Sequence, residues 1–250
     1  MVWIPGVDSS FDELTLEEAQ RLRDAGVKVF AQCLWTGNQQ PPPRIISLRN
    51  AQQVDMILIG NISVSPSRNG IEHVDAARAG IPDDLWEALA KTPIDVELPN
   101  LQYVNHVVAA WERSLQLGKP RDTYTSFNAW VNLLQNPIRP PGVGLWNALW
   151  DLHPDFDFPT LRYGGWQDNE VWGEQWSGGT LIEGQFADRN QFLLEALAQI
   201  PLSIESPVSY TIDTRIGSAT ALLANLWKDH NTRLLSGFDR EVLKWEVEQL

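Results

Sequence analysis

The sequence predicts an α/β fold: a single irregular (β/α) barrel that resembles a TIM barrel and carries a C-terminal helical extension. Short apolar runs alternate with amphipathic segments, which is the pattern of βα units that build a mostly parallel sheet. Eight strand-like runs follow one another, and that number fits a closed barrel better than an open sheet. The chain has 250 residues, 43% of them hydrophobic, which suffices for one barrel and its core.

The first half of the chain is expected to alternate regularly between strands and helices. Residues 27–35 are nearly continuous in apolar side chains, as is typical of a strand covered on both faces. Thr15 can cap the first helix, with Glu18 three residues on and Gly26 at its end. The expected strands are residues 1–8, 27–35, 55–64 and 93–98, and the expected helices are residues 15–25, 47–53, 73–79 and 82–90.

The second half is expected to complete the barrel and to add the extension. The strands are expected at residues 121–124, 144–150, 161–166 and 181–188, and the helices at 102–117, 126–134 and 189–200. The barrel domain is therefore expected to span residues 1–202. Residues 203–250 have apolar positions at helical spacing, so we expect a helical extension that docks on the barrel, on a second copy or on a virion protein.

Composition excludes several classes of partner. The net charge is −13, with 19 Lys and Arg residues against 32 Asp and Glu residues, which argues against nucleic acid. We expect no membrane helix, because no apolar run is long enough, and no secretory signal, because the N-terminus lacks a basic segment followed by an apolar one. The single Cys33 reads as a buried thiol and the four histidines lack ligand spacing, so we expect no metal site and no cofactor.

The segment Ile94-Asp95-Val96-Glu97-Leu98 is the first candidate for chemistry. Successive strand side chains point to opposite faces, so Asp95 and Glu97 share one face, with α-carbons about 6.5–7 Å apart. Two close carboxyls raise one pKa, which suits a general acid, and glycoside hydrolysis needs such a pair. The alternative is a solvated or ion-paired strand end.

Two further acids are expected to reach the same place. Asp8 ends the first expected strand and Asp188 ends the last, and these strands are neighbours in a closed barrel. Because a barrel places its chemistry at the carboxyl ends of its strands, all four acids are expected to converge on one mouth. The alternative for Asp8 and Asp188 is capping of the helices that follow them.

Several short motifs occur along the chain in a fixed order. They are Gly6-Val7-Asp8-Ser9-Ser10, Asp95-Val96-Glu97, Tyr124-Thr125 with Trp130, Leu145-Trp146-Asn147-Ala148, Gln175-Trp176-Ser177 and Ala187-Asp188-Arg189-Asn190. In order and spacing they resemble the glycoside hydrolase family 25 lysozymes, or muramidases, over roughly residues 3–195. The ends of the second and third expected strands depart from the family pattern, at Gln32-Cys33-Leu34-Trp35-Thr36-Gly37 and Gly60-Asn61-Ile62-Ser63-Val64, which indicates a divergent branch.

The resemblance implies a retaining hydrolase of the β-1,4 bonds in the glycan strands of peptidoglycan. It implies that Glu97 is the general acid and that Asp95 orients or stabilises the substrate's N-acetyl group, which attacks the sugar carbon. It implies that Asp8 and Asp188 support these two. Substrate-binding aromatic residues are expected to be Trp35, Tyr124, Trp146 and Trp176, although core packing is the alternative for any of the 12 tryptophans.

Three functions are compatible with this sequence. The first is the glycosidase, which the presence of all four acids favours. The second is a carbohydrate-binding barrel without catalysis, and the third is a structural component of a particle such as a phage tail. An enzyme made without a leader is expected to reach the cell wall in a virion or after release through a membrane pore.

Overall fold

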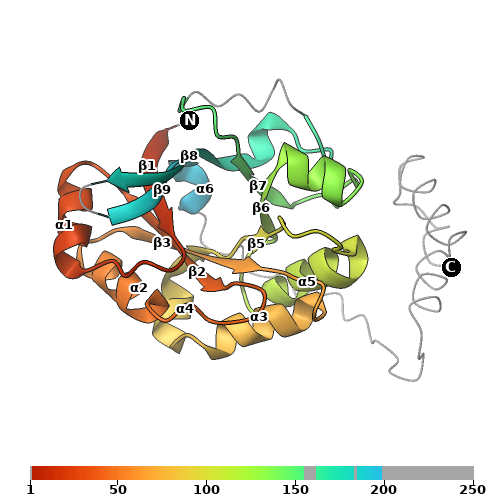
Figure 1. The fold of residues 1–250 in the computed structure, drawn as a ribbon, viewed down its shortest axis with the longest axis horizontal. Helices are drawn as coiled ribbons and strands as arrows, with labels where there is room; N and C mark the ends of the chain where they lie inside the picture. Colours follow the sequence, from red (N-terminus) through yellow and green to blue (C-terminus); the bar gives the residue numbers. More distant parts are fainter. Residues whose placement is uncertain (1, 155–161, 183–184, 199–250) are drawn as a thin grey trace, which may run out of the picture. The chain divides into compact units, whose positions relative to one another are not determined.

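The computed structural model describes residues 2–154, 162–182 and 185–198, and the expected extension at residues 203–250 lies outside them. The described strands form one mixed sheet in the order β2-β1-β9-β8-β7-β6-β5-β3-β4, and an additional β2–β3 pairing closes it into a ring (Figure 1). The strands are β1 Trp3–Ser9, β2 Val29–Trp35, β3 Ile57–Ser63, β4 Leu89–Lys91, β5 Ile94–Asp95, β6 Asp122–Ser126, β7 Gly144–Ala148, β8 Val171–Ile182 and β9 Gln185–Leu193. The expected α/β barrel is thus confirmed.

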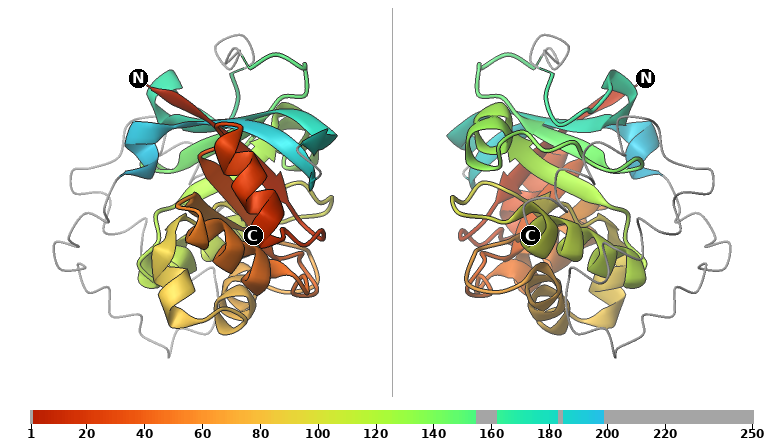
Figure 2. Two further views of the ribbon diagram at one scale, coloured as in Figure 1. Left: turned by 90° about the vertical axis from the view of Figure 1, so that its left-hand side faces the viewer. Right: turned by 90° about the vertical axis from the view of Figure 1, so that its right-hand side faces the viewer.

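Helices cover the outside of the barrel along its parallel half, opposite β8 and β9 (Figure 2). The α-helices are α1 Leu16–Asp24, α2 Arg44–Gln53, α3 Gly70–Ala79, α4 Asp83–Ala88, α5 Ala109–Gln116 and α6 Leu194–Leu197, with π-helical turns η1 Tyr103–Val108 and η2 Ala129–Leu133 and a 3-10 turn η4 Asp168–Glu170. Thr15 caps α1 as predicted, because its hydroxyl accepts the Glu18 N–H and the Glu18 carboxylate accepts the Thr15 N–H. In the described part of the chain, no helix has the length and apolar character needed to cross a bilayer.

The expected strand at residues 93–98 is shorter than predicted. The regular ladder covers β4 and β5, both parallel to β3, and Pro93 stands in the gap between them. Proline has no N–H to donate to a ladder, so the strand is interrupted there. Glu97 therefore lies two residues beyond β5, although Val96 still donates its N–H to the Tyr124 carbonyl at 3.0 Å.

The barrel closes through antiparallel strands, which corrects the expected order of its last elements. A strand was expected at residues 161–166, but the described residues 162–166 form none. The next strand is β8, which follows η4. Residues 189–193, expected to be helical, belong to β9, which pairs antiparallel with both β1 and β8. The pairing of two neighbouring strands outweighs local helix propensity here, and the short α6 follows before the described residues end.

The interior of the barrel is filled by large side chains at the end where the parallel strands begin. Phe192 and Trp146 are fully buried and meet at a ring-centroid distance of 5.1 Å. Gly6 makes room for Phe192, because a Cβ atom at Gly6 would lie 2.4 Å from its ring. Lys91 and Asp122 form a buried ion pair with Nζ and Oδ2 2.9 Å apart, so this end is packed and charge-balanced.

Candidate active site

Four acidic residues lie at the opposite end of the barrel, where its parallel strands finish. They are Asp8 on β1, Asp95 at the end of β5, Glu97 just beyond β5, and Asp188 on β9. Asp8 and Asp188 are direct partners in the β1–β9 ladder, since β9 runs antiparallel and an acid near its start meets an acid near the end of β1. The negative charges of Asp95, Asp8 and Asp188 all act on Glu97, so the structure brings the four predicted acids together.

Asp8 and Asp188 are held by amide side chains that sequence reasoning had not assigned to the site. The Gln175 amide nitrogen donates to one oxygen of each carboxylate, at 3.0 Å in both cases. Asn190 also donates to Asp8 at 2.6 Å, and the Gly179 N–H donates to Asp188. Neutral donors therefore orient this pair. Gln175 was visible in the Gln-Trp-Ser motif, which was the available signal.

Asp95 and Glu97 differ in how tightly the protein holds them. The Ser63 hydroxyl donates a short hydrogen bond to Asp95, which is half-buried. Val96, between the two acids, is buried, and its carbonyl accepts the Thr125 hydroxyl at 2.7 Å. Glu97 is exposed to solvent, so it is the acid of this pair that an incoming molecule can reach.

Burial raises the pKa values of all four carboxyls, and the charges of neighbouring carboxyls add to this shift at Glu97 and Asp8. The pKa of Glu97 rises to about 8, first through burial and then through the charges of Asp95, Asp8 and Asp188. Glu97 exposes part of its surface, while surrounding protein still excludes bulk water from much of its neighbourhood. Burial also raises the pKa of Asp8 to about 7, helped by the charge of Asp188.

At the other two carboxyls, burial and hydrogen bonds act on the pKa in opposite directions. Burial raises the pKa of Asp95 to about 6, while the Ser63 hydrogen bond lowers it. Burial raises the pKa of Asp188, and hydrogen bonds from Gly179 and Gln175 lower it. Glu97 is thus the member of the adjacent pair that holds its proton to the higher pH, and Asp95 is the member that ionises first.

Three of the four aromatic residues expected to stack on substrate are buried, which corrects that expectation. Trp146 is 0% exposed, and its indole N–H donates to Asn190 at 3.0 Å. Trp35 is 6% exposed and donates to His73 at 2.9 Å. Tyr124 is 6% exposed, and its hydroxyl donates to Gln175 at 2.7 Å. Tyr124 and Trp146 belong to the core inside the barrel, so they support the site from below. Trp35 instead packs in the core that the strands share with the helices.

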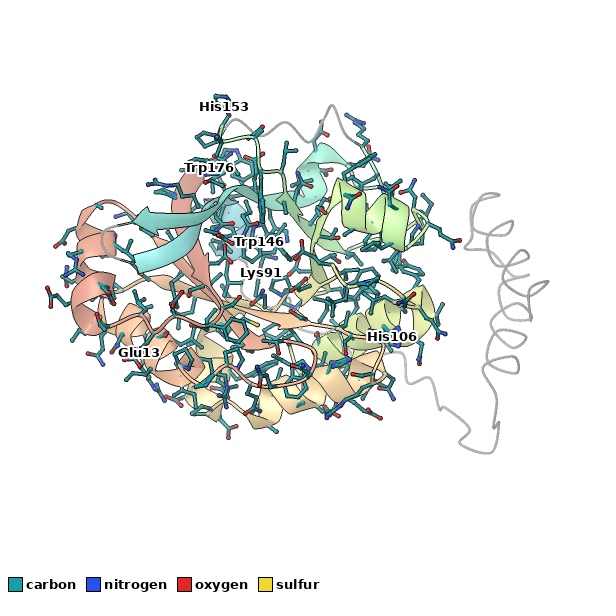
Figure 3. All side chains as sticks on the ribbon, in the orientation of Figure 1. Glu13, Lys91, His106, Trp146, His153 and Trp176 are labelled. Carbon is teal, nitrogen blue, oxygen red and sulfur yellow. The ribbon has the colours of Figure 1, made fainter. Side chains whose placement is uncertain are left out.

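Trp176 differs, because it remains half-buried with the Arg189 guanidinium 5.7 Å from its ring centroid. Figure 3 shows Trp146 near the middle of the barrel and Trp176 toward the upper edge. A direct contact between Trp176 and substrate stays a prediction.

Two aromatic residues near the acids were missed from the sequence. Trp150 is 65% exposed, and its indole N–H donates to Gln175 at 2.6 Å. The sequence reading placed it inside a strand over residues 144–150, whereas β7 ends at Ala148. Tyr163 is buried and near enough to Glu97 for that charge to raise the tyrosine pKa. It lies in a segment without regular structure, so no periodic pattern could reveal it.

The described residues offer no arrangement suited to a metal ion. Within that part of the chain, no group of three or more His, Cys, Asp or Glu side chains is placed to hold one. Direct hydrogen bonds from Gln175, Asn190 and Ser63 occupy oxygens of Asp8, Asp188 and Asp95 instead. The chemistry available to this arrangement is proton transfer by carboxyl groups.

The closed mixed barrel is similar in fold to solved structures of lysozymes and muramidases. A muramidase from Trichobolus zukalii has a TM-score of 0.62 at 18% identity, covering 76% of this chain and 93% of that one. A family GH25 lysozyme from Aspergillus fumigatus has a TM-score of 0.62 at 15% identity, covering 76% and 94%. A bacterial lysozyme from Streptomyces coelicolor has a TM-score of 0.64 at 15% identity, covering 78% and 94%.

These likenesses confirm at the level of fold the resemblance drawn from the motifs. No protein-family profile matches the chain, and no curated protein matches it in sequence. The chain thus shares a lysozyme-like barrel with proteins that are very distant in sequence.

Proposed function

We propose that this protein is a retaining glycosidase that cleaves β-1,4 bonds in the glycan strands of peptidoglycan. One observation carries the proposal: adjacent carboxyls, Asp95 and Glu97, have pKa values pushed apart to about 6 and about 8. Between these values Glu97 is mostly protonated while Asp95 is mostly charged, which is the division of labour that glycoside hydrolysis needs. The lysozyme-like fold supports a glycan as the substrate class.

In the proposed reaction Glu97 donates its proton to the glycosidic oxygen as the bond to the anomeric carbon breaks. The carbonyl oxygen of the substrate's own N-acetyl group attacks that carbon from the opposite face and forms a positively charged ring. The Asp95 carboxylate, held by Ser63, stabilises this positive charge and orients the amide. Glu97, now ionised, then removes a proton from water, which attacks the same carbon and restores the N-acetyl group with retained configuration.

Asp8 and Asp188 support this pair without touching the reacting atoms. Their charges raise the pKa of Glu97 and so favour the protonated acid. Their positions are fixed by Gln175 and by strand pairing between β1 and β9. The proposed place of action is the bacterial cell wall, where peptidoglycan lies.

The proposal is tested with the full-length protein and purified peptidoglycan. The wild type should lower the turbidity of the suspension and release fragments whose masses and new reducing ends identify a cleaved β-1,4 bond. Glu97→Gln should lower turnover roughly 10²–10³-fold, because the leaving oxygen loses its proton donor. Circular dichroism of the variant should match that of the wild type.

Glu87→Gln is the matched control, because Glu87 is an exposed glutamate at the end of α4, just before β4 begins. It should retain wild-type turnover. Absence of fragment release by the wild type would contradict the proposed function. Wild-type turnover in Glu97→Gln would instead show that another group is the acid.

A further inference from the structure

Gln175 has all four hydrogen-bonding positions of its amide occupied at the site. Its nitrogen donates to Asp8 and to Asp188, each at 3.0 Å. Its oxygen accepts from the Tyr124 hydroxyl at 2.7 Å and from the Trp150 indole N–H at 2.6 Å. Only one orientation of the amide satisfies this set, since a flipped amide would turn its oxygen toward two carboxylates and its nitrogen toward two donors. Hydrogen bonds at both the nitrogen and the oxygen therefore fix the orientation of the Gln175 amide.

Trp150 is the exposed member of this network. The residue is 65% exposed, yet its N–H donates to Gln175 and part of its ring lies close to Gly178. A Cβ atom at Gly178 would lie 3.2 Å from the indole, so the glycine lets the backbone approach closely. A large aromatic side chain that is both exposed and held in place is suited to contact a flat apolar ligand face at little entropic cost.

The location of Trp150 identifies the chemistry of that ligand. It follows β7, at the same end of the barrel as the four acids, and Gln175 alone separates its N–H from Asp8 and Asp188. The C–H face of a pyranose ring stacks on an indole while its hydroxyl and amide groups reach neighbouring polar side chains. A glycan fits this combination of an exposed aromatic ring and adjacent carboxylates.

We propose that Gln175 is a positioning residue that couples the binding of a sugar on Trp150 to the orientation of the Asp8 and Asp188 carboxylates. This inference rests on the proposed function for its substrate class. A sugar stacked on the indole changes the strength of the N–H hydrogen bond to the Gln175 oxygen, and the rigid amide passes the change to its nitrogen. Linkage is reciprocal, so the ionisation of the carboxylates in turn changes the affinity for the sugar.

The first experiment measures binding of a β-1,4-linked N-acetylglucosamine tetramer by calorimetry. Trp150→Ala should weaken binding about tenfold, because the stacking surface is lost. Trp150→Phe should bind within about threefold of the wild type, because the aromatic ring that stacks on the sugar remains. This variant removes only the N–H donor to Gln175. Failure of the wild type to bind the tetramer would overturn the proposal, whatever the outcome of the peptidoglycan assay.

The second experiment follows the Asp8 carboxyl by carbon NMR as pH is changed, with and without saturating tetramer. Gln175→Leu should raise the midpoint of Asp8 in the free protein, because a hydrogen bond that favours its charged form is lost. The tetramer should shift the wild-type midpoint and should not shift that of Gln175→Leu. A purely structural role for Gln175 predicts no such coupling.

Gln20→Leu is the matched control, because it removes another Gln–Asp hydrogen bond, 2.8 Å from Gln20 to Asp24 on the exposed face of α1. It should leave both the Asp8 midpoint and its response to tetramer unchanged. The other titratable groups that face Asp8 stay the same in every variant; they are Asp188, Asp95, Glu97, Tyr124 and Cys33.

Trp150→Phe gives a second arm if Gln175→Leu does not fold. It changes an exposed side chain and should reduce the tetramer-induced shift at Asp8 while binding persists. An equal shift in the wild type and in Trp150→Phe would overturn the proposed link. So would an unchanged Asp8 midpoint in the wild type on addition of tetramer.

Discussion

The two ends of the barrel differ in which groups stabilise their acidic side chains. Where the parallel strands begin, Asp122 is paired with Lys91 at 2.9 Å, and the Lys91 ammonium also lies 4.6 Å from the centroid of the Trp172 ring. Where they finish, Asp8 and Asp188 share one neutral amide donor, Gln175. The first arrangement compensates each charge with its opposite. The second gathers like charges.

An ion pair contributes to the stability of the fold, whereas a group of like charges shifts pKa values. A paired charge holds its place, and removing one partner leaves the other uncompensated in a low-dielectric interior. Like charges shift one another's pKa values into the range where protons move near neutral pH. The four acids therefore cost stability when they ionise, and the same repulsion contributes to the raised pKa of Glu97.

The largest effect is expected from breaking the Lys91–Asp122 ion pair, at the end of the barrel where the parallel strands begin. Lys91→Met should lower the free energy of unfolding by about 3–5 kcal/mol, because the Asp122 carboxylate stays buried without its cation. The double variant Lys91→Met with Asp122→Leu should recover much of that loss. Chemical denaturation measures both. A loss below about 1 kcal/mol for the single variant would contradict a structural role for this pair.

A smaller effect is expected from overfilling the same end. Gly6→Ala should lower the free energy of unfolding by about 1–3 kcal/mol, since the added Cβ would lie 2.4 Å from the Phe192 ring. The double variant Gly6→Ala with Phe192→Leu should lose less than the two single changes added together, because the smaller side chain relieves the clash. Thermal denaturation of the four proteins measures this, and strict additivity would contradict the contact.

The smallest effect concerns the mouth and its dependence on pH. The folded-state pKa values of Asp8, Asp95 and Glu97 lie above their ordinary values, so the folded state binds more protons than the unfolded state between about pH 4 and 8. This stabilisation is complete below about pH 4 and is lost as pH rises through about 6 to 8. Stability should therefore fall with rising pH over that window.

Glu97→Gln should reduce this fall. Because Glu97 is exposed and its charge is partly screened, we expect its share to be about 1 kcal/mol. The free energy of unfolding at pH 5 and at pH 8, for both proteins, measures the effect. The same pH slope in wild type and variant would show that the carboxyl of Glu97 is not coupled to folding.

The strand ends that carry Asp8 and Asp95 could be predicted from the sequence, because each follows an apolar run and precedes a turn. The spacing of Asp95 and Glu97 likewise anticipated that they would lie together. The direction of β9 could not be predicted, because the alternation around Asp188 and Asn190 is the same in a parallel and an antiparallel strand. Direction comes from pairing with β1, which is distant in sequence.

The aromatic residues were harder to assign for a related reason. Trp146 lies on a strand covered on both faces, so its neighbours are apolar and the pattern gives no sign of which tryptophan reaches solvent. Trp150 follows Leu149 and extends the apolar run, so it looked like strand interior. Its exposure depends on where β7 ends and on the glycine at position 178, neither of which periodicity reveals.

The pairing of β1 with β9 also sets when the mouth can form during synthesis. The hydrogen bond from Asn190 to Asp8 joins residues 182 positions apart, and the bond from Gln175 to Asp8 joins residues 167 apart. Contacts of such long range are made late, since the loop they close is large. A nascent chain that ends before β9 already contains Asp8, Asp95 and Glu97. It lacks the strand that fixes the position of Asp8. The ribosome therefore has to translate almost the whole barrel before the four acids can meet.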